Sequence, residues 1–193
     1  MASLLTTSDG LIEAVPSIHQ RSAFAQEVRR RFLNERFHAV AIELPPSLCD
    51  PFLQGVKQLP TVTAVVYHDP LEGSEGFTGG EERTSYLPID PCDSIVEAAR
   101  LAEQERIPIF CIDQESTVEP EPGIVLPDEY ALRITGLEAY YGAVRKVLDE
   151  APRGSTRWSR ENWMGLQLRH LAERLNPEVA SAANPSAAAP NTK

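Results

Sequence analysis

Three polar side chains capable of catalysis stand at the ends of predicted strands. They are His19 after the apolar segment Leu11–Ile18, Glu43 at the end of His38–Leu44, and Asp113 after Ile107–Ile112. If the strands are parallel, their carboxyl ends meet at one edge of a sheet, where ligands bind in open α/β sheets. The pattern therefore predicts that His19, Glu43 and Asp113 share one rim.

A histidine and two carboxylates on one rim support two kinds of chemistry. They can bind a divalent metal ion through imidazole nitrogen and carboxylate oxygen atoms. They can also act without metal, with His19 taking a proton from water or a substrate hydroxyl while a carboxylate orients the imidazole. Glu43 strengthens the prediction of a site, because a glutamate within an apolar strand is costly to bury unless it is paired. The residue types leave both chemistries open.

The same residues also have structural interpretations. A histidine after a strand is often a satisfied structural residue, and an aspartate such as Asp113 often caps the turn that follows a strand. His38, His68 and His170 carry no comparable pattern. The sequence contains no GxSxG, HExxH or GxGxxG motif, so it does not point to a known nucleophile, zinc or dinucleotide site.

The segments that must position these side chains alternate between strand and helix. Strands are expected at Leu11–Ile18, His38–Leu44, Thr61–Tyr67 and Ile107–Ile112, with a short extended piece at Ser85–Ile89. Helices are expected at Ser22–Glu35, about 51–58, from Asp90 or Asp93 to about Arg106, about 128–150 and about 156–175. This order predicts an α/β fold: a mostly parallel sheet of about four strands, flanking helices and two C-terminal helices.

Three residues give helix-start signals. Ser22 is expected to cap the first helix, and Asp93 is one candidate cap of the third. Asp50 followed by Pro51 is typical of an N-cap with proline at the first helical position. The glycine-rich, acidic stretch 69–82 is expected to be a loop, and it lacks the pattern of a phosphate-binding loop.

The charge balance limits the partners. Of the 193 residues, 28 are acidic and 18 basic, for a net charge of -10. Such a surface repels nucleic-acid phosphates and anionic lipid. Arg29, Arg30 and Arg31 could form a phosphate patch, but a solvated helix face is the preferred interpretation. No apolar stretch approaches a membrane span, and the first ten residues do not resemble a signal peptide.

The cysteines and the composition of the chain end complete the expectations. Cys49, Cys92 and Cys111 show no CxxC spacing, so three reduced thiols in a cytoplasmic protein are expected. Residues 1–177 are expected to form one domain. Residues 178–193 are expected to be a disordered tail rich in Ala, Pro and Asn, because they carry too few large apolar side chains to offset their ordering entropy.

Several segments together resemble a known superfamily. The stretch VPSIHQRSAFAQEVRRRFLNERFHAVAIELPPSL contains a strand ending at His19, a helix, and a strand ending in an apolar-Glu-Leu element. CDSIVEAARLAEQERIPIFCIDQE ends a helix–strand unit in Asp113, and RWSRENWMGLQLRHLAE carries Arg160, Glu161 and Met164. In this order the segments resemble the start of the TraB/PrgY/GumN (Tiki-type), ChaN-like and erythromycin-esterase-like proteins.

The resemblance implies a hydrolase-like domain that cleaves an ester or peptide bond. His19 would be the general base or a ligand of a divalent metal, and Glu43 would orient it or co-ligate. Asp113, Arg160 and Glu161 would line the substrate site. Pro16 replaces the glycine of the family's GxxH element, and the second histidine motif has no counterpart, so the chain is expected to match the N-terminal half of the family domain.

Two further interpretations stand beside hydrolysis. The chain can be a non-catalytic domain that keeps the fold and binds a small molecule or a partner protein. It can also be a unit whose sheet is completed by another chain, including a second copy in a homodimer, because an unfinished sheet has an open edge strand.

Overall fold

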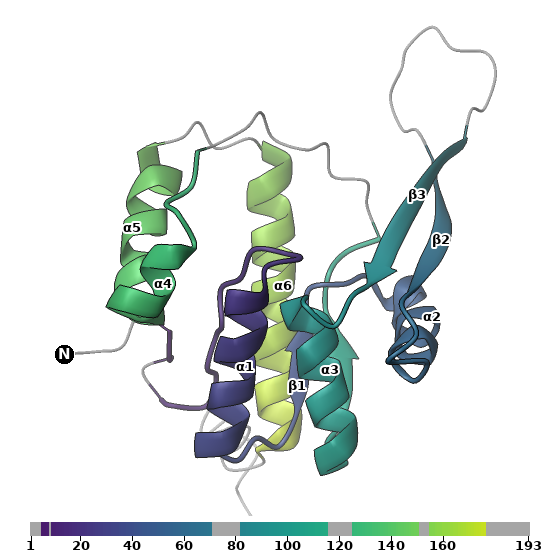
Figure 1. Cartoon of the computed structure of the whole chain (residues 1–193), viewed down its shortest axis with the longest axis horizontal. Coiled ribbons are helices and arrows are strands. Elements are labelled where there is room, and N and C mark those ends of the chain that lie inside the picture. The colour runs from purple at the N-terminus through teal and green to yellow at the C-terminus, as the bar shows by residue number, and fades with distance from the viewer. Residues whose placement is uncertain (1–4, 8, 71–81, 116–124, 151–154, 177–193) are drawn as a thin grey trace, which may run out of the picture.

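The computed structural model describes residues 5–7, 9–70, 82–115, 125–150 and 155–176 (Figure 1). The predicted disordered tail at 178–193 and the centre of the predicted glycine-rich loop, residues 71–81, lie outside them. Among the described residues, no helix combines the length and the apolar character that crossing a membrane would require.

The described residues form six helices and four strands in an α/β arrangement. In chain order these are α1 (Ser22–Asn34), β1 (Val40–Ile42), α2 (Pro46–Val56), β2 (Thr63–Pro70), β3 (Glu82–Ile89), α3 (Ser94–Glu105), β4 (Ile109–Cys111), α4 (Tyr130–Thr135), α5 (Leu137–Glu150) and α6 (Ser155–Leu175). The predicted mixed α/β class is therefore confirmed.

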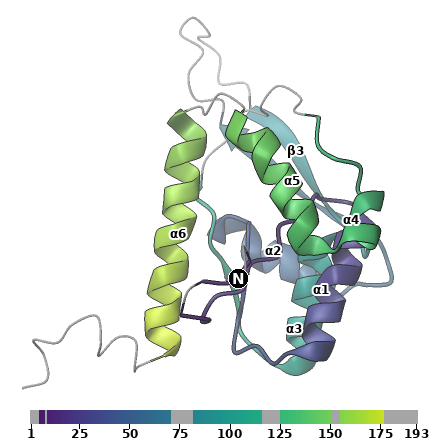
Figure 2. The same cartoon turned by 90° about the vertical axis from the view of Figure 1, so that its left-hand side faces the viewer.

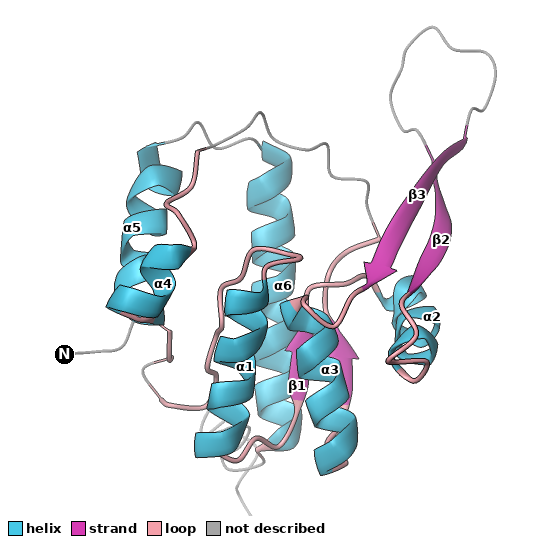
Figure 3. Ribbon diagram, in the orientation of Figure 1, coloured by secondary structure: helices cyan, strands magenta, loops and turns pink. Residues whose placement is uncertain are grey.

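The predicted sheet of four mostly parallel strands is wrong. Among the described strands, β1 pairs with β4 in parallel, and β2 pairs with β3 antiparallel in a separate sheet (Figure 3). The antiparallel pair runs in register from Thr63 opposite Ile89 to Pro70 opposite Glu82. Only positions 71–81 separate β2 from β3, which is fewer than the dozen or more residues of a parallel crossover, so β3 returns antiparallel beside β2 as the second strand of a hairpin.

The predicted first strand, Leu11–Ile18, is also wrong. All of these residues are described, yet none lies in a strand, and Glu13 makes only an isolated bridge to Thr6. Val15 and Ile18 instead pack against a small core beside α1, α4 and α5. The segment is apolar because it covers this core, which a periodicity argument cannot distinguish from a strand buried in a sheet.

Two apolar cores hold the fold together. The larger lies among α2, α3 and the strands, and comprises Ile42, Leu44, Phe52, Val56, Ile89, Ile95, Val96 and Ala99. The smaller joins the N-terminal segment to α1, α4 and α5, and comprises Leu5, Phe24, Leu132, Leu137 and Tyr140. The larger core fixes β1 and β4, and therefore the chain positions that follow their carboxyl ends.

The helix starts differ in part from the expected ones. Asp93 caps α3 as expected, accepting a hydrogen bond of 2.9 Å from the Ile95 N–H. Arg21, not Ser22, is the N-cap of α1, without a side-chain cap bond among the described residues. α2 begins at Pro46 rather than near Pro51, which lies inside the helix. Pro46 is favoured at the first helical position because its missing N–H has no intrahelical acceptor there.

The helix predicted at about 128–150 is divided in two. α4 ends at Thr135 and α5 begins at Leu137, with Gly136 between them at φ 82°. A positive φ of this kind interrupts the right-handed helix, and glycine adopts it without the steric cost that a Cβ brings. The helix predicted at about 156–175 is confirmed as α6.

The prediction of three reduced cysteines is wrong for two of them. Cys49 on α2 and Cys111 on β4 form a disulfide with their Cα atoms 5.9 Å apart. The two residues are 62 positions apart in sequence, so no local spacing pattern could reveal the pair. Cys92 is an exposed free cysteine.

We predict opposite effects for the same substitution at two helical glycines. A Cβ at Gly55 in α2 would lie 2.7 Å from the Ile89 side chain, which is fully buried, whereas a Cβ at Gly165 in α6 would meet no atom within 4 Å. Gly55→Ala should therefore lower the free energy of unfolding by about 1–3 kcal/mol through overpacking. Gly165→Ala should stabilise α6 by about 0.5–1 kcal/mol. Urea unfolding of both variants tests the pair, and equal shifts would contradict it.

Candidate functional site

His19 pairs with a residue that is far from it in sequence. The structure sets its Nδ1 atom 3.2 Å from Oδ2 of Asp93, at the amino end of α3. The Asp93 side chain is only 7% exposed, whereas that of His19 is 54% exposed. The aspartate is thus held inside the fold, while the imidazole remains accessible to solvent.

Asp93 is fixed by two further hydrogen bonds. Its Oδ1 accepts from the Ile95 N–H as the helix cap, and its Oδ2 accepts from the Gln20 N–H at 2.8 Å. Gln20 has a left-handed backbone with φ 59°, which is unfavourable for a residue other than glycine. The bond to Asp93 compensates this cost and anchors the His19–Gln20 turn onto α3.

Beside this pair, Arg160 of α6 binds two acids at the strand ends. Its Nε donates to Oδ1 of Asp113 at 2.9 Å, and its Nη2 lies 2.5 Å from Oδ2 of Asp113 and 2.6 Å from Oε1 of Glu43. Glu43 follows β1 and Asp113 follows β4, and the Asp113 N–H donates to the Leu44 carbonyl. The parallel pairing of β1 and β4 therefore brings both acids to one rim, as predicted.

The charges of this cluster shift the pKa of the histidine. Asp93 raises the pKa of His19 through its hydrogen bond and its charge, and the Glu43 charge adds to the rise. Partial burial and the Arg160 charge oppose this rise. Burial works to raise the pKa of Asp93, but its hydrogen bonds from His19, Gln20 and Ile95 prevail and hold it below the usual value.

The structure also raises the pKa of Arg160. Its hydrogen bond to Asp113 is the main cause, and the charges of Glu43 and Asp113 add to it. Arg160 is therefore a permanent cation between two carboxylates.

The predicted site residues thus form two groups. His19 belongs to the pair with Asp93, and Glu43, Asp113 and Arg160 form the ion-paired group. Glu161 is the exposed neighbour of Arg160 on α6, and about 100° of helical rotation separates the two side chains. Glu43 was expected to orient His19, but the Nδ1–H of His19 donates its hydrogen bond to Asp93, and Glu43 acts on the imidazole through charge.

A divalent metal does not fit the described group. Within the described part of the chain, no three His, Cys, Asp or Glu side chains gather where they could hold a metal ion. Arg160 places a positive charge between Glu43 and Asp113, where a second cation would be repelled. The residues of this rim therefore give no basis for a step that uses a metal.

Asp93 is a member of the candidate site to which sequence reasoning assigned only a structural role. The signal that identified it as a cap was local, whereas its pairing with His19 spans 74 positions. An N-cap aspartate uses one oxygen on the helix, so the second oxygen is available to another donor. This second oxygen indicated that Asp93 could accept a further hydrogen bond, but it did not indicate that His19 is the donor.

The arginines of α1 do not form a free phosphate patch. Arg29 pairs with the buried carboxylate of Glu97, and Arg30 pairs with Glu27. Arg31 contacts Glu13 and Glu27. These carboxylates neutralise the run of positive charge. Arg29 and Arg30 are solvated, as the preferred interpretation expected, whereas the Arg31 side chain is only 19% exposed.

Two hollows on the described surface adjoin α1 and do not include the residues of the cluster. One lies between α1 and α4 and includes Arg133, and the other lies between α1 and the start of α3 and includes Arg29 and Cys92. Neither is lined by His19, Asp93 or the Arg160 group. The candidate site is therefore an open rim rather than either of these hollows.

Comparison of the chain with protein-family models, with curated proteins and with solved structures gives no match. The interpretation of the site accordingly depends on its own geometry.

Proposed function

We propose that the chain is a hydrolase-type domain in which the His19–Asp93 pair activates water against an ester or peptide bond. The observation that carries this proposal is the contact of a buried aspartate with Nδ1 of a half-exposed histidine. The resemblance to the TraB and erythromycin-esterase-like proteins motivates the choice of bond. It supplies no evidence of activity.

The proposed step follows from the two nitrogen atoms of the imidazole. Asp93 accepts a hydrogen bond from Nδ1–H, which keeps the proton on Nδ1 and leaves Nε2 as the basic nitrogen. Nε2 takes a proton from water as the water oxygen attacks the carbonyl carbon. The bond to the alcohol or amine then breaks, and the proton on Nε2 passes to that leaving group. The products are an acid and an alcohol or amine, so the atoms balance.

The remaining cluster supports this role through charge and position. Glu43 and Asp93 favour the protonated imidazolium that forms during the step. Arg160 ties the ends of β1 and β4 together through Glu43 and Asp113. Under this proposal Glu43, Asp113 and Arg160 border the substrate.

A non-catalytic interaction domain is the second candidate. It is favoured by the outward face of the β2–β3 hairpin, where the paired residues Val66 and Tyr86 are both exposed. Isolated exposed apolar residues are common, but neighbours on one strand pair form a small apolar surface.

The test of the hydrolase proposal is a matched pair of histidine variants. We expect hydrolysis of p-nitrophenyl esters or a fluorogenic peptide to fall at least about 100-fold in His19→Ala, because the general base is removed. His38→Ala removes an exposed histidine outside the cluster and should leave the rate unchanged. Initial rates at pH 7–8 with purified protein give the comparison.

Two results would contradict hydrolysis. One is the absence of turnover by the full-length chain on both substrate types. The other is equal loss in His19→Ala and His38→Ala, since adventitious ester cleavage by surface imidazoles has that signature. Either result would leave the interaction domain as the better-supported function.

A further inference from the structure

The helix α6 differs from the other described helices in how it meets the rest of the molecule. No described side chain of α6 is buried, whereas every other described helix buries at least one side chain. Figure 2 shows α6 lying alongside the body formed by α1–α5, with its axis running past the sheet and the other helices. Apolar burial therefore contributes less to the attachment of α6 than to that of its neighbours.

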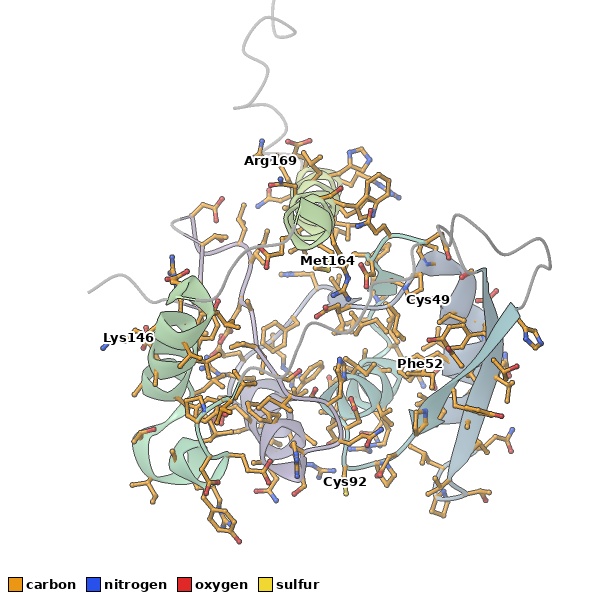
Figure 4. The ribbon with its side chains drawn as sticks, turned by 90° about the horizontal axis from the view of Figure 1, so that it is seen from above. Cys49, Phe52, Cys92, Lys146, Met164 and Arg169 are labelled. Carbon is orange, nitrogen blue, oxygen red and sulfur yellow. A yellow bond between two sulfur atoms is a disulfide. The ribbon has the colours of Figure 1, made fainter. Side chains whose placement is uncertain are left out.

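One side of α6 faces the body. Arg160, Met164, Leu168 and Leu171 are spaced four, four and three residues apart and are all partly buried, so they share this side. Figure 4 shows Met164 directed toward the body and Arg169 directed away from it. Trp163 and Leu166 on other sides are exposed. The partly buried apolar side chains form a weak contact with the body, and Arg160 is the only charged residue of these four.

Arg160 makes the strongest described contact between α6 and the strands. It spans the Asp113 carboxylate with both Nε and Nη2 and also reaches Glu43. The Asp113 side chain is 8% exposed and that of Arg160 28%, so this pair is largely shielded from water, whereas the Glu43 side chain, which was expected to be buried, is 46% exposed. Arg–carboxylate pairs of this forked geometry are among the stronger polar contacts in proteins.

We propose that α6 is a detachable helix that closes over the strand-end rim and is held there by the Arg160 ion pairs. With α6 attached, Arg160 occupies oxygen atoms of Asp113 and Glu43. With α6 detached, these oxygen atoms are released to solvent beside His19, so the helix controls access to the rim. Segments with little buried apolar surface open below the free energy of global unfolding. The proposal does not depend on hydrolysis, because it concerns the attachment of a helix.

Amide hydrogen exchange of the full chain tests this proposal. In the wild type we expect the amides of residues 159–175 to exchange faster than those of α1 and α3. Arg160→Gln should accelerate exchange in α6 at least tenfold while α1 and α3 stay unchanged, since Asp113 then has no cation and is poorly solvated as long as α6 covers it. The matched control is Arg169→Gln. Nine residues further along, it lies on the opposite side of the helix and should leave exchange unchanged.

A second pair of variants separates ionic from apolar attachment. Asp113→Asn removes the partner charge at the end of β4 and should accelerate amide exchange in α6 as Arg160→Gln does. Met164→Ala removes an inward apolar contact and should change exchange less than threefold.

Three outcomes would overturn the proposal. The first is wild-type α6 protection equal to that of α3, which would make α6 part of the global unfolding unit. The second is an equal acceleration of amide exchange in α1, α3 and α6 in both Arg160→Gln and Asp113→Asn. The third is a Met164→Ala effect as large as that of Arg160→Gln, because α6 would then be held by apolar contacts.

Discussion

Reduction of the Cys49–Cys111 disulfide is expected to lower the free energy of unfolding by about 4 kcal/mol. The bond joins α2 to β4 across 62 positions of the sequence. A cross-link that closes a loop of this length restricts the unfolded chain, and the loop-entropy relation gives roughly 4 kcal/mol at 25 °C. The loss is a large part of the stability of a domain of this size, for which about 5–15 kcal/mol is usual.

Urea unfolding followed by circular dichroism, with and without a phosphine reductant, measures this loss. The Cys92→Ala background removes the exposed free thiol and prevents exchange with the disulfide. Cys49→Ala/Cys111→Ala in the same background is the matched control. Its unfolding midpoint should be close to that of the reduced protein and should not change when the reductant is added. An unchanged midpoint of the Cys92→Ala protein on reduction would show that the bond is absent or does not constrain the unfolded chain.

The parts of the fold that the sequence predicts correctly are those fixed by local patterns. The apolar face of Ser22–Glu35 predicts α1, and Asp93 is one of the two starts expected for α3. The short apolar runs around β1 and β4 are correct within a few residues. Because these two strands are parallel, the prediction that Glu43 and Asp113 share a rim is also correct.

The parts that the sequence does not predict depend on which segments pair. The strand pattern of Thr61–Tyr67 is real, but the pattern does not say that β2 pairs with β3 rather than with β1 or β4. Leu11–Ile18 has the apolar content of a strand and instead covers the smaller core. Burial explains both patterns equally well, and only the three-dimensional arrangement separates sheet pairing from core covering.

The candidate site shows the same limit. Glu43 was singled out from a strand end, Arg160 from the family resemblance, and His19 from a predicted strand that the structure does not contain. Their partners are remote in sequence: 74 positions separate His19 from Asp93 and 47 separate Arg160 from Asp113. Because the chain contains many acidic residues, charge alone does not identify which of them pairs with His19 or with Arg160. The selection of Asp93 for His19 follows from the packing of α1 on α3, which brings the start of both helices together.

Loss of Asp93 is expected to destabilise the chain by about 2–3 kcal/mol in the Asp93→Ala variant. The substitution removes the cap of α3 and leaves the Gln20 and Ile95 N–H groups without their acceptor. Asp93→Asn keeps an oxygen for the cap but loses the negative charge beside His19, so it should lower the free energy of unfolding by less than Asp93→Ala does. Chemical unfolding of both variants at pH 5 gives the two values.

The pH dependence of the His19–Asp93 contact follows from the two pKa shifts. The pKa of His19 is raised above its ordinary value of 6.5, so its stabilisation is complete below pH 6.5 and is lost as the pH rises through the folded pKa. The pKa of Asp93 is lowered below 3.8, so its stabilisation is complete above pH 3.8 and is lost as the pH falls through the folded pKa. The contact therefore stabilises the fold most between these limits.

The difference in unfolding free energy between the wild type and His19→Gln should accordingly be largest near pH 5 and should decrease above pH 7. Glutamine retains a donor for Asp93 but does not titrate, which isolates the effect of protonation. His38→Gln, which removes an exposed imidazole outside the described cluster, is the matched control. A difference that is constant from pH 4 to 9 would mean that the charge of His19 contributes nothing to the pair, and the contact with Asp93 would then be only a neutral hydrogen bond.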